Sequence, residues 1–252
     1  MQRVAVITGG SGGIGKAMAQ AFLAAGARGV VLADLDAVAV RSAADELGCV
    51  GMACDVTDEA QVQALADFAT EQFGQIDLFC SNAGAGGEGL LTDASNAVWQ
   101  QQWELHVMAH LYAARAVLPQ MLARGEGYLL NTASAAGLLA AMGSGPYTVS
   151  KAAAVKLAEF LAITHGDDGI KVSVLCPQGV NTAMAPKRLG DGQTDGIIEA
   201  EELARTVVDC LREERFYVLP HPEVAEYVRR KGNDVDRWLQ GMRRLRRLNP
   251  EA

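Results

Sequence analysis

Tyr147 and Lys151 are the residues whose types and spacing first point to chemistry. They stand four apart in the segment Tyr-Thr-Val-Ser-Lys, at the start of a predicted helix, so both side chains leave one face of that helix. An ammonium beside a phenol lowers the phenol pKa from about 10 towards neutral pH, and a tyrosine tuned in this way can donate and accept a proton. The pair therefore indicates acid–base chemistry, although this spacing alone is common.

A glycine cluster between a predicted strand and a predicted helix indicates a nucleotide site. Its members fit two overlapping spacings, Gly10, Gly12 and Gly15 as G-x-G-x-x-G, and Gly9, Gly13 and Gly15 as a wider pattern after Thr8. Residues without Cβ let the backbone turn sharply and approach a pyrophosphate, which then sits on free N–H groups at the helix N-terminus. The alternative is a purely structural turn, but the strand–turn–helix context favours dinucleotide binding.

Asp34 ends the second predicted strand, where an acidic side chain can accept hydrogen bonds from the adenosine ribose hydroxyls. A carboxylate at this place would also repel a 2′-phosphate, and no Arg or Lys lies between Val30 and Val40 to offset that repulsion. The sequence therefore favours NAD(H) over NADP(H). The alternative role of Asp34 is a helix N-cap, which Asp36 can supply alone.

Apolar runs alternate with helical stretches and predict the framework that carries these residues. The expected strands are Val4 to Ile7, Gly29 to Ala33, Val50 to Cys54, Ile76 to Cys80, Gly127 to Thr132, Lys171 to Leu175 and Phe216 to Leu219. Continuous apolar runs suit strands that are covered on both faces, which predicts an α/β fold with a doubly wound, parallel, seven-stranded Rossmann sheet. We expect a single domain, with residues 1–221 as its dinucleotide-binding and catalytic part and residues 222–252 as a C-terminal helical extension.

The stretch from Pro222 to Leu248 predicts an amphipathic C-terminal helix. Its apolar residues at helical spacing, opposite a basic face, are Val235, Trp238, Leu239, Met242 and Leu245. Three roles stay open for this helix: docking on its own body, closing over the site of a neighbouring subunit, or binding an acidic membrane surface.

Composition narrows the classes of protein and site to consider. The 252 residues carry a net charge of −8, which argues against nucleic-acid binding because phosphate contacts need a basic surface. No apolar run is long enough for a membrane span, and the N-terminal run is too short for a signal peptide, so we expect a cytoplasmic protein without stable membrane insertion.

Five cysteines without a C-x-x-C pair predict free thiols. His106 and His110 could form a metal pair, but no third ligand is apparent, so no metal is expected.

Four motifs in order along the chain resemble the short-chain dehydrogenase/reductase family over about residues 3–220. They are Thr8 to Gly15, Ser81-Asn-Ala-Gly84, Ser134, and Tyr147 to Lys151. The resemblance implies an oxidoreductase in which Tyr147 is the general acid/base, Ser134 holds the substrate oxygen, and Lys151 holds the nicotinamide ribose and tunes the tyrosine. It implies hydride transfer between NAD(H) and the carbon of a secondary alcohol or ketone, with the cofactor carrying the redox chemistry.

The same resemblance implies the places of further cofactor contacts. Asp55 and Val56 should border the adenine, and the segment from Pro177 to Thr182 should cover the nicotinamide. The full set of expected cofactor-binding residues is Gly9, Ser11, Gly13, Ile14, Gly15, Asp34, Asp55, Val56, Asn82, Ala83, Gly84, Tyr147, Lys151, Pro177, Gly179, Val180 and Thr182. The family also implies a homodimer or homotetramer, built on the helices that carry Tyr147 and His106.

Two departures from the family pattern bear on mechanism. His106 stands where the family usually has an asparagine that supports a proton-relay water, so we count it among the catalytic candidates; the alternative is a bystander histidine with another partner. Gln178 stands where a glycine usually follows Pro177, which places a side chain near the nicotinamide or the substrate. These departures keep a rival open, a noncatalytic NAD(H)-binding sensor or scaffold, beside the nearer alternative of an NADP-dependent carbonyl reductase.

Substrate walls are expected from residues 86–91, 135–142 and 183–197. The middle segment is apolar and has no charged anchor, which favours an uncharged, fairly hydrophobic alcohol or ketone. In the third segment, Lys187 and Arg188 could instead hold an anion, although solvated loop charges are commoner.

Overall fold

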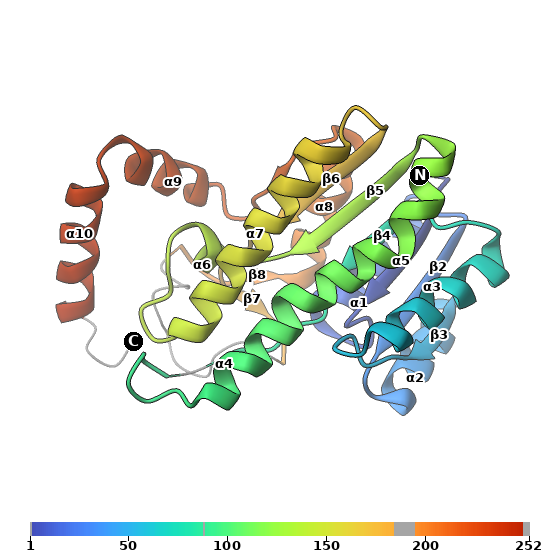
Figure 1. The fold of residues 1–252 in the computed structure, drawn as a ribbon, viewed down its shortest axis with the longest axis horizontal. Helices are drawn as coiled ribbons and strands as arrows, with labels where there is room; N and C mark the ends of the chain where they lie inside the picture. Colours follow the sequence, from blue (N-terminus) through green and yellow to red (C-terminus); the bar gives the residue numbers. More distant parts are fainter. Residues whose placement is uncertain (1, 88, 184–194, 249–252) are drawn as a thin grey trace.

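The computed structural model describes residues 2–87, 89–183 and 195–248. Within this part of the chain, seven parallel strands form one sheet in the order β3-β2-β1-β4-β5-β6-β9 (Figure 1). The strands are β1 (Val4–Thr8), β2 (Gly29–Asp34), β3 (Val50–Ala53), β4 (Leu78–Ser81), β5 (Gly127–Thr132), β6 (Ile170–Leu175) and β9 (Tyr217–Val218). The predicted doubly wound, seven-stranded α/β sheet is confirmed.

Helices cover both faces of the sheet, which explains the continuous apolar runs of the strands. One face carries α3 (Glu59–Phe73), α5 (Ala109–Arg124) and α7 (Gly145–His165), and the other carries α1 (Gly13–Ala24), α2 (Ala37–Leu47) and α8 (Ala200–Arg212). In β1, Val6 packs into the first layer and Ile7 into the second. Every residue of β1 is buried as a result, as expected for a central parallel strand.

Strand β1 lies between β2 and β4, so the chain leaves it in one direction along the sheet and later continues in the other. This reversal opens a crevice at the carboxyl ends of the strands, which is where ligands bind in doubly wound sheets. The motifs that follow β1, β4 and β5 all lie at this edge.

The long helix expected near Val98 to Leu122 is divided into three parts. It consists of α4 (Asn96–Trp103), a π-helical turn η1 (Glu104–Met108) and α5. A π-turn inserts an extra residue into a helix and is frequent at functional sites. His106 lies in this turn.

The pattern of apolar residues in the sequence did not predict three short elements. They are α6 (Ala135–Leu138) and the two-stranded pair β7 (Val180–Asn181) and β8 (Ile198–Glu199). Most of the expected loop from Ala183 to Gly196, with Lys187 and Arg188, lies outside the described residues.

The predicted single C-terminal helix is wrong, because the stretch forms two helices, α9 (Glu223–Asn233) and α10 (Val235–Leu248). Asp234 between them is extended, with φ −156° and ψ 92°, and its Oδ1 accepts the N–H of Arg237 at 2.9 Å. An aspartate in this role starts a new helix and so interrupts the one before it. The apolar spacing runs on within α10 and gives no sign of the break.

The two helices relate differently to the body of the protein. Helix α9 packs on it: Val224 is fully buried, and the Lys231 ammonium donates to the carbonyl oxygens of Leu138 at 2.6 Å and Leu139 at 3.3 Å. Helix α10 has no buried residue and stands apart from the layered body (Figure 1). Of the three roles expected for the C-terminal stretch, docking on the chain's own body is the one that α9 shows. Over the described residues, no helix has both the length and the apolar character needed to cross a bilayer.

Candidate active site

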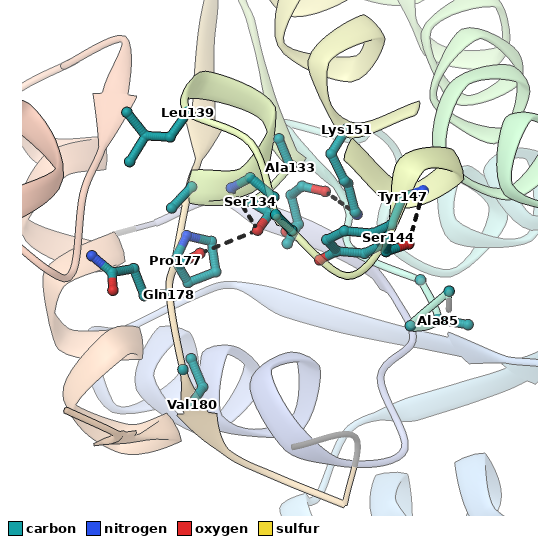
Figure 2. Close-up of a pocket in the computed structure, with 18 of the residues that line it drawn as sticks. Ala85, Ala133, Ser134, Leu139, Ser144, Tyr147, Lys151, Pro177, Gln178 and Val180 are labelled. Carbon is teal, nitrogen blue, oxygen red and sulfur yellow. Dashed lines mark hydrogen bonds between the residues drawn. The ribbon is translucent and has the colours of Figure 1, made fainter. Parts of the chain in front are cut away.

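Ser134, Tyr147 and Lys151 come together at the carboxyl edge of the sheet (Figure 2). Ser134 follows β5 and caps α6, with its Oγ accepting the N–H of Ala136 at 3.2 Å. Tyr147 lies in the first turn of α7, and its phenol lies beside the Ser134 side chain. One turn further along, the buried Lys151 ammonium donates to the carbonyl oxygen of Thr132 at 3.0 Å. Three of the four predicted catalytic side chains thus face one cavity.

Burial changes the pKa values of Lys151 and Tyr147. It lowers the pKa of Lys151 to about 8, because an ammonium loses its hydration inside the protein. It also raises the pKa of Tyr147, against the smaller lowering effect of the Ser134 hydrogen bond. Lys151 Nζ lies 5.7 Å from the centre of the tyrosine ring, so the pair has the predicted geometry, but the chain alone does not produce the lowered tyrosine pKa.

His106 is fully buried beside Tyr147, with the two rings edge to face at 5.5 Å and 88°. Its Nε2 accepts the N–H of Ala85 at 3.3 Å, so Nδ1 carries the proton and donates to Ser150 Oγ at 2.9 Å. The Ser150 hydroxyl in turn donates to the carbonyl oxygen of Tyr147 at 3.1 Å. Burial, followed by the charge of Lys151, lowers the pKa of His106 to about 2, which keeps the ring neutral. Both ring nitrogens are thus occupied within the protein.

The glycine turn has the close backbone approaches that its spacing predicts. A Cβ on Gly15 would lie 2.1 Å from the carbonyl oxygen of Gly9, and Gly9 itself has φ +63°. Helix α1 begins after Gly12 and has no side-chain cap, so its first N–H groups remain available to an anion. A cradle of this kind fits the pyrophosphate of a dinucleotide.

Asp34 lies at the end of β2, close to the glycine turn. Its Oδ2 accepts the N–H and the hydroxyl of Ser11, at 3.0 Å and 2.6 Å. The N-cap of α2 is Asp36, which accepts the N–H groups of Val38 and Ala39, so helix capping does not require Asp34.

One cavity of about 2080 Å³ joins the glycine turn to the catalytic residues. The expected site residues that line it are Gly9, Ser11, Gly13, Ile14, Asp34, Asp55, Val56, Asn82, Ala83, Gly84, Ser134, Tyr147, Lys151, Pro177, Gly179, Val180 and Thr182. Gly15 and His106 are expected site residues that do not line it. Gly15 packs against the Gly9 carbonyl group, and His106 packs against Tyr147 and Ser150 of α7.

Sequence reasoning missed the part of the cavity formed by the C-terminal helices. Tyr227, Trp238 and Met242 line it from α9 and α10; the apolar spacing of the tail was visible, but its destination was not. Gln178 also lines the cavity, and its amide donates to Asp195 Oδ2 at 2.7 Å. Among the described residues, no three His, Cys, Asp or Glu side chains are grouped closely enough to hold a metal ion.

Comparison with known proteins gives the family of the chain. The family model for short chain dehydrogenases matches residues 3–191. The 1-deoxy-11-beta-hydroxypentalenate dehydrogenase of Streptomyces exfoliatus is 36% identical, over 94% of this chain and 90% of that protein. The 3beta-hydroxysteroid dehydrogenase 2 of Eggerthella lenta is 35% identical, over 71% of this chain and 72% of that protein.

Solved structures agree with this relationship. The crystal structure of a short chain dehydrogenase/reductase from Burkholderia phymatum in complex with NAD has a TM-score of 0.84 and 34% identity, covering 93% of this chain and 94% of that one. The chain therefore belongs to the short-chain dehydrogenase/reductase family, as an oxidoreductase that uses a nicotinamide cofactor to act on CH–OH groups.

Proposed function

We propose that the protein is an NAD(H)-dependent dehydrogenase of a secondary alcohol that is uncharged and fairly hydrophobic. The observation that carries the choice of cofactor is Asp34, whose carboxylate lines the cavity beside the glycine turn and is hydrogen bonded to Ser11. A carboxylate there accepts hydrogen bonds from ribose hydroxyls and repels a 2′-phosphate. Lys16, the nearest cation along the chain after the glycines, is paired with Glu46 on α2.

The catalytic residues divide the reaction between them. Bound NAD would supply the hydride acceptor for the alcohol carbon. The ionised Tyr147 phenolate takes the proton from the alcohol oxygen, while the Ser134 hydroxyl, which lies beside the phenol, holds that oxygen in place. Lys151 stabilises the tyrosinate that accepts this proton, because its ammonium lies close to the ring and is anchored to Thr132. In the reverse direction Tyr147 returns the proton to the carbonyl oxygen.

We assign His106 a positioning role in place of proton transfer. His106 donates a hydrogen bond to Ser150, which in turn donates to the carbonyl oxygen of Tyr147. These two bonds stabilise the turn of α7 that carries the catalytic phenol. A ring with a pKa of about 2 does not gain a proton near neutral pH, which argues against His106 as an acid or base.

The substrate class follows from the walls of the cavity near Tyr147. Ala135, Ala136, Leu139, Ala140 and Ala141 contribute an apolar surface there, and such a surface favours an alcohol with an apolar body. The names of the hydroxypentalenate and hydroxysteroid dehydrogenases among the relatives are consistent with this class, whereas another relative is named a 2-(R)-hydroxypropyl-CoM dehydrogenase.

The assembly we propose is a homodimer or homotetramer. Large apolar side chains that are exposed on α4 and α7 are Trp103, Val149, Phe160 and Ile163, and grouped exposure of this kind indicates a contact surface. We also place the protein in the cytoplasm, since all five cysteines are free thiols, as is usual in a reducing compartment.

The test is NADH formation, followed by absorbance, with purified protein, NAD or NADP, and a panel of apolar secondary alcohols. We expect turnover with NAD that is lost in Tyr147→Phe, a variant that keeps the ring and removes the hydroxyl. Turnover that persists in Tyr147→Phe would reject the catalytic assignment. A preference for NADP would reject the choice of cofactor and favour a carbonyl reductase.

A further inference from the structure

Helices α9 and α10, which we call the C-terminal arm (residues 223–248), line the same cavity as the catalytic residues. We propose that this arm forms the outer wall of the substrate site and selects large apolar alcohols, and that Gln178, Asp195 and Tyr227 hold the arm in place. The proposal rests on the proposed function, because it concerns the substrate of the same site.

The face that α10 turns to the cavity is defined by spacing. The residues of α10 and its cap that line the cavity are Asp234, Arg237, Trp238, Gly241, Met242, Leu245 and Arg246. They recur at intervals of three and four, so they share one side of the helix. Trp238, Met242 and Leu245 form the apolar centre of that side. Val235 and Leu239, at 51% and 49% exposed, belong to the apolar stripe but do not line the cavity.

A short chain of hydrogen bonds connects the arm to the catalytic region. The Gln178 side-chain amide donates to Asp195 Oδ2 at 2.7 Å, and the Tyr227 hydroxyl donates to Asp195 Oδ1 at 2.9 Å. Gln178 follows Pro177, whose carbonyl oxygen accepts the Ser134 hydroxyl. The glutamine that departs from the family pattern therefore ties the loop behind Ser134 to α9.

Tyr227 also connects α9 to α10. Its ring meets that of Trp238 at 6.3 Å between centres, tilted by 43°. Lys231, one turn beyond Tyr227 on the same side of α9, donates to the carbonyl oxygens of Leu138 and Leu139 at the end of α6. Contacts at two successive turns of α9 thus fix the direction in which α10 leaves it, while α10 itself buries no residue.

This arrangement makes selection depend on the size of the substrate. A small alcohol held by Ser134 and Tyr147 can react without touching α10. A larger apolar skeleton that reaches across the cavity removes the half-buried faces of Trp238 and Met242 from water, and that burial favours binding. The arm should therefore lower KM for large alcohols and leave small ones unaffected.

The first experiment compares two uncharged alcohols, the polycyclic steroid epiandrosterone and cyclohexanol, as substrates with NAD. In Trp238→Ala we expect kcat/KM for epiandrosterone to fall about tenfold, through KM, with less than about twofold change for cyclohexanol. The matched control is Leu239→Ala, an apolar truncation one residue away on the side that does not line the cavity, and it should change neither substrate. Equal losses on both alcohols, or a wild-type preference for cyclohexanol, would overturn the proposal.

A second variant tests how the arm is held. Tyr227→Phe keeps the ring against Trp238 and removes only the hydroxyl that bonds Asp195, so we expect a loss of about fivefold in kcat/KM for epiandrosterone alone. No loss would reject the role of Asp195 and Tyr227.

Binding measurements separate the role of the C-terminal arm in holding the substrate from the catalytic reaction. In a Tyr147→Phe background, calorimetry should show tighter binding of epiandrosterone with Trp238 present than with Trp238→Ala, whether or not the chain turns the steroid over. Equal affinities would reject the wall while leaving the catalytic assignment untouched. A change of assembly state in Trp238→Ala by gel filtration would place α10 in a subunit contact and likewise reject the wall.

Discussion

His106 Nδ1 lies 2.9 Å from Ser150 Oγ, and this contact ties the π-helical turn to the helix that carries the catalytic tyrosine. The histidine stands where the family usually has an asparagine, yet it is neutral and has a partner on each nitrogen. The role that we propose for it is therefore to orient Tyr147 through Ser150.

Replacing His106 should reveal this positioning role. His106→Leu leaves the Ser150 hydroxyl and the Ala85 N–H without their partner in a buried place, so we expect a loss of about 1–3 kcal/mol in the free energy of unfolding and a lower kcat. His106→Asn retains a donor and an acceptor and should recover part of kcat. Neither the wild type nor His106→Asn should show a kinetic pKa near 6.5 from this position. A wild-type ionisation near 6.5 that disappears in His106→Asn would identify the histidine as a titrating group instead.

Lys151 should give the stability of the protein a measurable dependence on pH. Its pKa is about 8 in the folded chain and 10.5 as the ordinary value, so between these limits the unfolded state binds more protons. Stability from this group must therefore rise with pH across that window, by up to about 1.4 kcal/mol per pH unit. The Lys151→Met variant should lack this contribution to the pH dependence of stability and should lose activity. At pH 7 it should no longer bear the free-energy cost of burying a charged ammonium. Urea unfolding of both proteins at pH 7 and pH 9.5 without cofactor measures the difference; equal slopes would mean that Lys151 is not destabilised by burial.

The sheet and the pair of Tyr147 and Lys151 could be predicted from the sequence because each depends on local pattern. Buried parallel strands read as apolar runs, and Tyr147 and Lys151 are brought together by the geometry of a single helix. The position of Ser134 depended on the family resemblance, since nothing in its own neighbourhood distinguishes it from other serines.

The C-terminal arm shows where local pattern stops being sufficient. The apolar stripe of α10 predicted a helix correctly, but its break at Asp234 is set by one side-chain cap. The direction of α10 is set by contacts between residues far apart in sequence, such as Lys231 with Leu138. Similarly, the partner of Gln178 is Asp195, 17 residues further along the chain, and no spacing rule connects the two.

Two glycines of the same turn should respond differently to a methyl group. Gly15→Ala brings a Cβ to 2.1 Å from the Gly9 carbonyl oxygen, so the backbone must shift, and we expect a loss of about 2–3 kcal/mol in stability. Gly12 has nothing within 4 Å of the corresponding position and lines the cavity. Gly12→Ala should keep its thermal midpoint and lose affinity for NADH. Thermal unfolding and NADH fluorescence titration give the two readouts, and equal destabilisation of both variants would contradict the assignment.

Asp34 and Asp36 offer a matched pair for testing cofactor choice. Asp34→Ala removes the carboxylate that we place against the ribose hydroxyls, so kcat/KM with NAD should fall about tenfold and the preference for NAD over NADP should shrink. Asp36→Ala removes the N-cap of α2 and should cost about 1 kcal/mol of stability, with the NAD to NADP ratio unchanged. Steady-state kinetics with both cofactors, together with urea unfolding, distinguishes the roles. If Asp34→Ala leaves the ratio unchanged, the carboxylate serves only to hold Ser11, and NAD selection must lie elsewhere in the groove.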